Sequence, residues 1–248
     1  MNEIDEKPIK DALTLTREKM HNIASERIAE IVKEFTQGFK FLEDFPKSIT
    51  FFGANQFSPD NPYYQSAQIL SGRLVKELGY TIVSGGGPGI MEAANRGAFE
   101  AGGNSIGLLI KLPHEQKINH YVTKTFPSYY FFVRKVLLTF SAEAFIFYPG
   151  GYGTLDEFFE ILTLIQTKKI SNIPVICVGS EYWNKLKKFI IDEMLARKTV
   201  NEEESELFQI VDDHDKIIEI IKKVPVRMVV PFNQTDTVLR DKTTGPSS

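Results

Sequence analysis

The sequence predicts an α/β fold in which helices cover both faces of a doubly wound, mostly parallel β-sheet. Three observations lead to this fold class: short and almost continuous apolar runs, amphipathic segments of helical period between them, and turn residues at the junctions. Strands of a parallel sheet are buried on both faces, so they read as apolar runs and not as alternating patterns. Such runs alternating with helices are typical of a sheet between two helical layers.

Each element follows from one of these patterns. The apolar runs closed by turn residues predict strands over 48–54, 80–86, 105–110, 144–150 and 173–179. The segments of helical period predict helices over 64–78, 90–101, 129–140, 155–167, 182–195 and 216–223. A further charged amphipathic helix is expected over 15–35, ahead of the first strand.

The composition predicts an ordinary globular protein. The chain has 248 residues, of which 42% are hydrophobic and 25% charged. We predict a helical N-terminal extension (1–45), a Rossmann-like domain (46–224) and a C-terminal tail without periodicity (225–248). The only cysteine, Cys177, lies in an apolar run and is expected to be a buried hydrophobic residue.

Charge and hydropathy limit the partners. A formal net charge of -3 gives no reason to expect nucleic acid or an anionic membrane as the main partner. The first residues lack the apolar core of a signal peptide, and no apolar run approaches the roughly 20 residues that span a bilayer. The sequence therefore predicts a cytoplasmic protein without a membrane partner.

Two glycine-rich loops are predicted at the carboxyl ends of strands, where open parallel sheets bind their ligands. They are "GGGPG" at 85–89 and "GGYG" at 150–153, and each leads into a helix. Backbone N–H groups of such a loop and the positive end of the helix dipole suit a phosphate. Neither loop fits GxGxxG and the chain has no GK[ST], which argues against dinucleotide and Walker-type sites. One such loop alone is equally well explained as a tight turn, but two favour an anion site.

Two features beside these loops have a structural explanation as well as a functional one. Thr154 and Glu157 have the spacing of a capping box, in which both side chains bind backbone donors at a helix start. Arg134 lies within an apolar helical stripe, where a snorkelling arginine or a structural salt bridge is the alternative. Because both lie next to a predicted anion site, we favour a functional role.

The motifs resemble one family. The stretches "GGGPGIMEAANRGAFEAGG" (85–103), "RK" (134–135) and "PGGYGTLDE" (149–157) are similar to the LONELY GUY (LOG) phosphoribohydrolases, formerly labelled lysine decarboxylases, whose hallmark is PGGxGTxxE. The resemblance covers about 48–183, and the N-terminal helix is similar to that of longer bacterial members. It implies hydrolysis of the N-glycosidic bond of nucleoside 5'-monophosphates, AMP or N6-modified AMP such as cytokinin riboside 5'-monophosphate, giving free base and ribose 5-phosphate.

The same resemblance implies the site residues. Arg134 and Glu157 would be catalytic, and a carboxylate can stabilise the oxocarbenium-like state of glycoside cleavage. The implied substrate-binding residues are Gly85, Gly86, Gly87, Met91, Glu92, Asn95, Lys135, Gly150, Gly151, Gly153 and Thr154. No metal and no cofactor is implied. The segment 155–170 carries apolar positions beyond one stripe, Ile161 and Leu164, which together with the resemblance predicts a homodimer or larger homo-oligomer.

Other functions remain open at this stage. A pyridoxal-phosphate decarboxylase needs a Schiff-base lysine, usually after histidine, and the chain has no His-Lys pair. A non-catalytic nucleotide-binding or carrier protein on the same fold would differ only by its lack of turnover. The preferred base and the acid that protonates it are not identified, since the loop 54–64 is expected to face the base. The histidines share no ligand spacing and are expected in solvated loops: His21, His114, His120 and His214.

Overall fold

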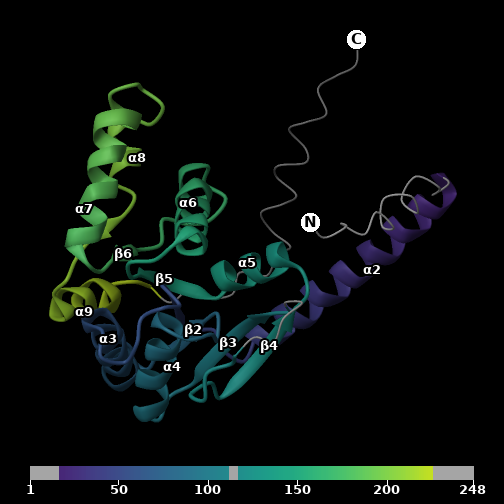
Figure 1. Cartoon of the computed structure of the whole chain (residues 1–248), viewed down its shortest axis with the longest axis horizontal. Coiled ribbons are helices and arrows are strands. Elements are labelled where there is room, and N and C mark those ends of the chain that lie inside the picture. The colour runs from purple at the N-terminus through teal and green to yellow at the C-terminus, as the bar shows by residue number, and fades with distance from the viewer. Residues whose placement is uncertain (1–16, 112–116, 226–248) are drawn as a thin grey trace, which may run out of the picture.

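The computed structural model of the chain describes residues 17–111 and 117–225. Within these ranges, strands form one parallel sheet in the order β4-β3-β2-β1-β5-β6-β7 (Figure 1). The predicted doubly wound α/β fold is confirmed. The first part of the predicted N-terminal extension and all but residue 225 of the predicted tail lie outside the described residues.

The predicted apolar runs form buried strands close to the expected positions. The strands are β1 Ser48–Phe52, β2 Thr81–Ser84, β3 Ser105–Ile110, β4 Lys124–Ser128, β5 Ala142–Phe147, β6 Val175–Cys177 and β7 Gln209–Ile210. Neither β4 nor β7 was predicted. β4 is a largely exposed edge strand that contains Pro127, and β7 pairs through only two residues, so neither contains an apolar run.

The helices also match the predicted segments, with differences at their ends. They are α2 Arg17–Leu42, α3 Pro62–Leu78, α4 Ile90–Glu100, α5 Phe131–Phe140, α6 Tyr152–Gln166, α7 Ser180–Phe189, α8 Glu202–Ser205 and α9 His214–Lys222, and a π-helix over Ile190–Leu195 continues α7. α2 ends at Leu42 and not near residue 35, because its last turns pack on α5. There Phe39 meets Phe140 edge to face, with ring centroids 4.7 Å apart.

Helices cover both faces of the sheet (Figure 1), and one apolar core lies on each face. α3, α4 and α9 cover one face, and α2, α5, α6 and α7 cover the other. Ile161 of α6 is fully buried in the second core, so its expected position on an additional apolar face was wrong. Cys177 is buried, as predicted. No helix in the described ranges is long and apolar enough to cross a membrane.

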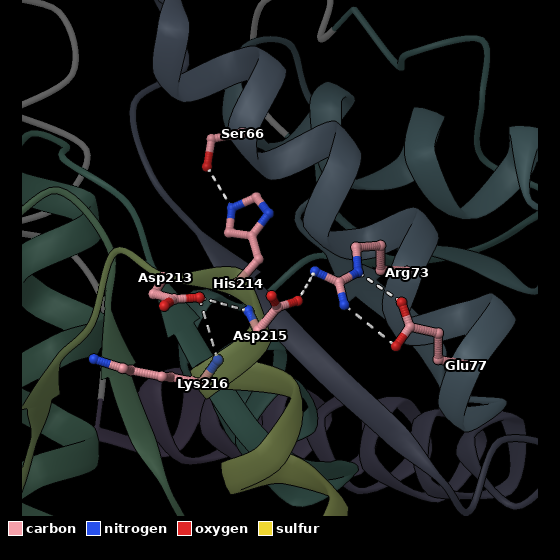
Figure 2. Close-up of polar contacts among 7 residues, drawn as sticks. All are labelled: Ser66, Arg73, Glu77, Asp213, His214, Asp215 and Lys216. Carbon is pink, nitrogen blue, oxygen red and sulfur yellow. Dashed lines mark hydrogen bonds and ion pairs between the residues drawn. The ribbon is translucent and has the colours of Figure 1, made fainter.

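Polar contacts fix α9 to α3 (Figure 2). The Asp213 carboxylate caps α9 by accepting from the backbone N–H of Asp215, at 2.9 Å. Arg73 Nη1 of α3 pairs with Asp215 at 2.7 Å, and His214 Nε2 lies 2.8 Å from Ser66 Oγ. His214 is therefore a half-buried helix residue, and its prediction as a solvated loop histidine was wrong.

The order of the strands creates one crevice. β1 lies between β2 and β5, with the chain running on to β2 and β3 on one side and from β5 to β6 and β7 on the other. The loops that leave β1 and β5 therefore diverge, and such a switch point is where open α/β sheets bind ligands.

Candidate functional site

A cavity of about 420 Å³ lies at this crevice. Its walls come from the loop after β1, the end of β2, and the helices α4, α5 and α6. The lining residues are Phe51, Phe52, Gly53, Ala54, Asn55, Gln56, Gly85, Met91, Phe131, Arg134, Leu138, Gly151, Tyr152, Gly153, Thr154, Asp156 and Glu157. Both glycine-rich loops and both predicted catalytic residues thus contribute to one cavity.

Glu157 lies in the second turn of α6 with 7% of its surface exposed. One carboxyl oxygen, Oε2, is buried without a hydrogen-bond partner among the described residues. Burial raises the pKa of Glu157 to about 7, and the neighbouring cations Lys135 and Arg134 oppose this shift. A buried carboxyl group that the fold leaves unpaired is available to a ligand.

The capping box considered for Thr154 and Glu157 is absent. α6 begins at Tyr152 with Gly151 as its N-cap, and no side chain caps it within the described residues. Thr154 and Glu157 both lie inside the helix, so neither side chain caps its N-terminus. The first turn of α6 therefore presents its backbone N–H groups and its positive dipole end beside the cavity.

Arg134 of α5 is held by the backbone. Its Nε donates to the carbonyl of Leu108 at 2.6 Å, and Nη2 lies 3.5 Å from the carbonyl of Gly85. Burial lowers the pKa of Arg134, while Glu157 acts to raise it. The described hydrogen bonds go to carbonyls and not to a carboxylate, so the structural salt bridge considered for Arg134 is not seen in the described ranges. Among the described residues, the guanidinium charge is not neutralised by a carboxylate hydrogen bond, and it can act on a ligand.

Glycine is required where the loops approach the charged groups. A Cβ on Gly85 would lie 2.2 Å from Arg134 Nη2, and one on Gly150 would lie 2.1 Å from Thr154 Oγ1. The loop after β1 is tied to the second glycine-rich loop, because the backbone N–H of Ala54 donates to the carbonyl of Pro149 at 3.0 Å. These glycines therefore allow Arg134 and the start of α6 to lie close together at the cavity.

Several predicted binding residues lie outside the cavity lining. Gly86, Gly87 and Gly150 belong to the loops but do not line the cavity. Glu92 accepts a hydrogen bond from the Tyr64 hydroxyl at 2.9 Å. These residues shape the loops and the packing of α4 on α3.

Asn95 is fully buried beneath the first glycine loop. Its Oδ1 accepts from Ser84 Oγ at 2.6 Å and from Asn119 Nδ2 at 3.0 Å, while its Nδ2 donates to Ser105 Oγ at 2.8 Å. The Ser84 hydroxyl in turn accepts from the Gly86 N–H at 3.0 Å. The side chain of Asn95 therefore supports the loop from below.

Lys135 points to the outer side of α6. Its ammonium lies 2.9 Å from Asp156 and 2.5 Å from Glu160. It lines an adjoining, more open groove of about 570 Å³, which shares Tyr152 and Asp156 with the cavity of Glu157, but Lys135 does not line that cavity. Its charge still reaches Glu157, whose pKa it lowers.

The residue-level prediction missed part of the wall. Asn55 and Gln56 come from the loop after β1, which the sequence suggested only as a whole segment. Phe131, Asp156 and the 95% exposed Tyr152 also line the cavity. Tyr152 occupies the variable position of the PGGxGTxxE motif, so the motif could not single it out. Of the histidines expected in solvated loops, His120 is exposed in its loop and His114 lies outside the described residues.

Solved structures share this fold. The X-ray structure of TM1055 aligns with a TM-score of 0.55 and 22% identity, over 72% of this chain and 99% of that one. The molybdenum cofactor carrier protein of Chlamydomonas reinhardtii aligns with a TM-score of 0.52 and 21% identity, over 72% and 98%. At these identities the likeness concerns the fold alone.

Sequence comparisons identify the family. A cytokinin riboside 5'-monophosphate phosphoribohydrolase of Rhodococcoides fascians is 29% identical over 150 residues, which is 58% of this chain and 74% of that protein. The probable cytokinin riboside 5'-monophosphate phosphoribohydrolase LOGL3 of Oryza sativa subsp. japonica is 32% identical over 149 residues, 59% and 69% of the two chains. The family model described as "Possible lysine decarboxylase" matches residues 91–221. From these matches and the geometry of its motifs, the chain belongs to the LOG family.

Proposed function

We propose that this protein hydrolyses the N-glycosidic bond of nucleoside 5'-monophosphates, releasing free base and ribose 5-phosphate. The substrates are AMP, N6-modified AMP such as cytokinin riboside 5'-monophosphate, or both. The observation that carries the proposal is the buried Glu157 carboxyl group, left unpaired beside Arg134 at the uncapped start of α6. The phosphoribohydrolase names of the relatives agree with it.

The 5'-phosphate would bind at the start of α6. Gly151, Gly153 and Thr154 line the cavity there, and the first-turn N–H groups and the helix dipole favour an anion. Arg134 adds a positively charged guanidinium group, whose forked donor geometry matches phosphate or a pair of ribose hydroxyl groups. This binding energy positions the sugar beside Glu157.

Glu157 would act on the ribose. Cleavage of an N-glycosidic bond develops positive charge on the sugar ring, and an adjacent carboxylate stabilises that charge. The same carboxylate can orient the water that attacks the anomeric carbon. In the reaction, the bond from the sugar to the base nitrogen breaks, water supplies the new hydroxyl group, and the base leaves with a proton.

The rest of the cavity would hold the base. Met91, Phe131 and Leu138 provide an apolar wall for a flat ring, and Asn55 and Gln56 provide amide groups at the loop after β1. We propose that these residues, and no cofactor or metal, complete the binding site.

A screen of nucleoside monophosphates for release of free base and ribose 5-phosphate tests the proposal. We expect turnover of AMP or an N6-modified AMP and little turnover of adenosine, because adenosine lacks the phosphate. Adenosine cleaved as fast as AMP would contradict the phosphate site. Tight binding of every nucleotide without ribose 5-phosphate production would favour a carrier, as the molybdenum cofactor carrier's name suggests for that structure. An aldimine absorbance band in purified protein would instead support a pyridoxal-phosphate enzyme.

We also propose that the protein assembles as a cytoplasmic homodimer or larger homo-oligomer. α5 leaves Phe131, Phe132, Val136 and Phe140 partly exposed, while Phe132 and Phe140 also contact Phe35 and Phe39 of α2. Phe131 also lines the cavity. A second copy on this face would bury the apolar side chains and cover the mouth of the cavity.

A further inference from the structure

The peptide group between Gly150 and Gly151 has unusual freedom. Both residues lack a Cβ, and nothing lies within 4 Å of the position that a Cβ would take on Gly151. Glycine adopts many backbone conformations at little steric cost, so a peptide between two glycines can rotate readily. The orientation of this peptide can therefore be set by a contact from outside the loop.

Tyr182 of α7 supplies such a contact. Its hydroxyl group donates a hydrogen bond to the carbonyl of Gly150 at 2.8 Å. In a planar trans peptide, the carbonyl and the next N–H point in opposite directions. Gly151 lines the cavity and Tyr182 does not. Holding the Gly150 carbonyl toward Tyr182 thus turns the Gly151 N–H away from α7.

The adjoining peptides are fixed by other bonds. The Pro149 carbonyl accepts from the Ala54 N–H at 3.0 Å, and the Gly151 carbonyl accepts from the Leu155 N–H at 3.1 Å. Of these three consecutive carbonyls, the middle one is bound by a side chain, and the outer two by backbone groups. A single substitution can therefore remove its partner without altering the backbone.

Tyr182 is itself held in place. It lies in the first turn of α7, where the Asp212 carboxylate accepts from the backbone N–H of Gly179 at 2.6 Å and of Ser180 at 3.1 Å. Its ring packs edge to face on buried Trp183, with centroids 5.0 Å apart. The hydroxyl position is thus set by α7 and the loop before α9.

We infer that Tyr182 is a positioning residue that orients the Gly150–Gly151 peptide so that the Gly151 N–H faces the bound phosphate. The inference rests on the proposed function for its ligand, a phosphate monoester. No side chain of α7 lines the cavity. The inference nevertheless assigns control over phosphate affinity to this helix. Tyr182 acts through the loop and does not touch the substrate.

Tyr182→Phe in the full chain tests this role, because it removes one hydroxyl group and keeps the ring on Trp183. Binding of ribose 5-phosphate and of inorganic phosphate is measured by calorimetry. We expect both affinities to fall about tenfold, the upper range for one neutral hydrogen bond. KM for AMP should rise by a similar factor with kcat within about twofold, since the loop binds ground state and transition state alike.

Tyr80→Phe is the control, since Tyr80 is a buried tyrosine that precedes β2 at the opposite end of the strands. It should leave ribose 5-phosphate affinity unchanged. A Tyr182→Phe protein with wild-type affinity and KM overturns the inference, whether or not its melting temperature falls. Wild-type protein that binds neither phosphate compound also overturns it.

The same measurements separate this inference from the proposed reaction. Glu157→Gln should lower kcat about 100-fold or more and keep ribose 5-phosphate affinity, because its carboxyl group is not part of the loop. If no nucleotide is hydrolysed but Tyr182→Phe still weakens ribose 5-phosphate binding, the proposed reaction fails and the positioning role stands.

Discussion

The carboxyl group of Glu157 is subject to opposing effects. Burial disfavours its charged form, Glu160 and Asp156 add repulsion, and Lys135 and Arg134 favour the carboxylate. The result is a pKa raised to about 7, so the group titrates in the neutral pH range. In the proposed complex, a phosphate bound beside Glu157 would add negative charge and raise its pKa further, while Lys135 and Arg134 would favour the carboxylate.

We predict that kcat/KM for AMP rises with pH through about 7. The reason is that the proposed active form is the carboxylate, and the raised pKa of Glu157 sets where it forms in the free enzyme. Glu157→Gln should lower kcat about 100-fold or more, because the amide brings no charge to an oxocarbenium-like state. Rates measured from pH 5 to 9 check both statements. A wild-type rate that stays constant between pH 6 and 8 would contradict the assignment.

Lys135 should tune this titration without touching the substrate. Its ammonium lowers the pKa of Glu157, so Lys135→Met is expected to move the rising limb of kcat/KM to higher pH. Lys188→Met is the control, since Lys188 pairs with Asp192 on an exposed part of α7 and is absent from the groups acting on Glu157. A limb that stays in place or moves to lower pH in Lys135→Met would show that Lys135 is not coupled to Glu157.

At the scale of elements, burial decided what the sequence could predict. β1, β3 and β5 are buried throughout, so their apolar runs predict them well. β4 lies at an edge, where exposed residues remove that signal. The start of α6 shows a different limit, because Thr154 and Glu157 fit a capping pattern that fails once the helix begins at Tyr152.

α9 should respond to acid through His214. Burial lowers the pKa of His214 and Arg73 lowers it further, while Asp213 and Asp215 oppose the shift (Figure 2). Below the ordinary pKa of about 6.5 the unfolded chain binds a proton that the folded protein resists. The free energy of unfolding should therefore decrease as the pH falls below 6.5.

His214→Gln checks the cause, because the glutamine amide can reach the position of Nε2 and bond to Ser66 but does not titrate in this range. Urea unfolding at pH 7.5 and 5.5 should show a smaller loss of stability in this variant than in the wild type. An equal or larger loss in the variant would assign the acid sensitivity to other groups.

At the scale of the molecule, the predicted motifs met at one cavity but not every motif residue reached it. The resemblance implied Arg134 and Glu157 together, and strand order explains how, since α5 leads into β5 and α6 leaves it. The contribution of Asn55 and Gln56 depends on β1 lying beside β5, a long-range pairing that local patterns do not encode. Asn95 and Lys135 turn away from the cavity because buried hydroxyl groups and carboxylates bind them elsewhere.

The exposed face of α5 leads to the last prediction, which concerns assembly. Val136 is 39% exposed on this face, so the fold of the monomer should tolerate Val136→Asp. The aspartate would place a charge in the proposed subunit contact. We expect sedimentation to show an oligomer for the wild type and a smaller species for the variant, with AMP hydrolysis reduced because the cavity mouth loses its cover. Ile69→Asp, on the exposed side of α3, is the matched control and should leave assembly and activity intact. A wild-type monomer at micromolar concentration with full AMP hydrolysis would mean that one chain completes the site, and the apolar face of α5 would then need another explanation.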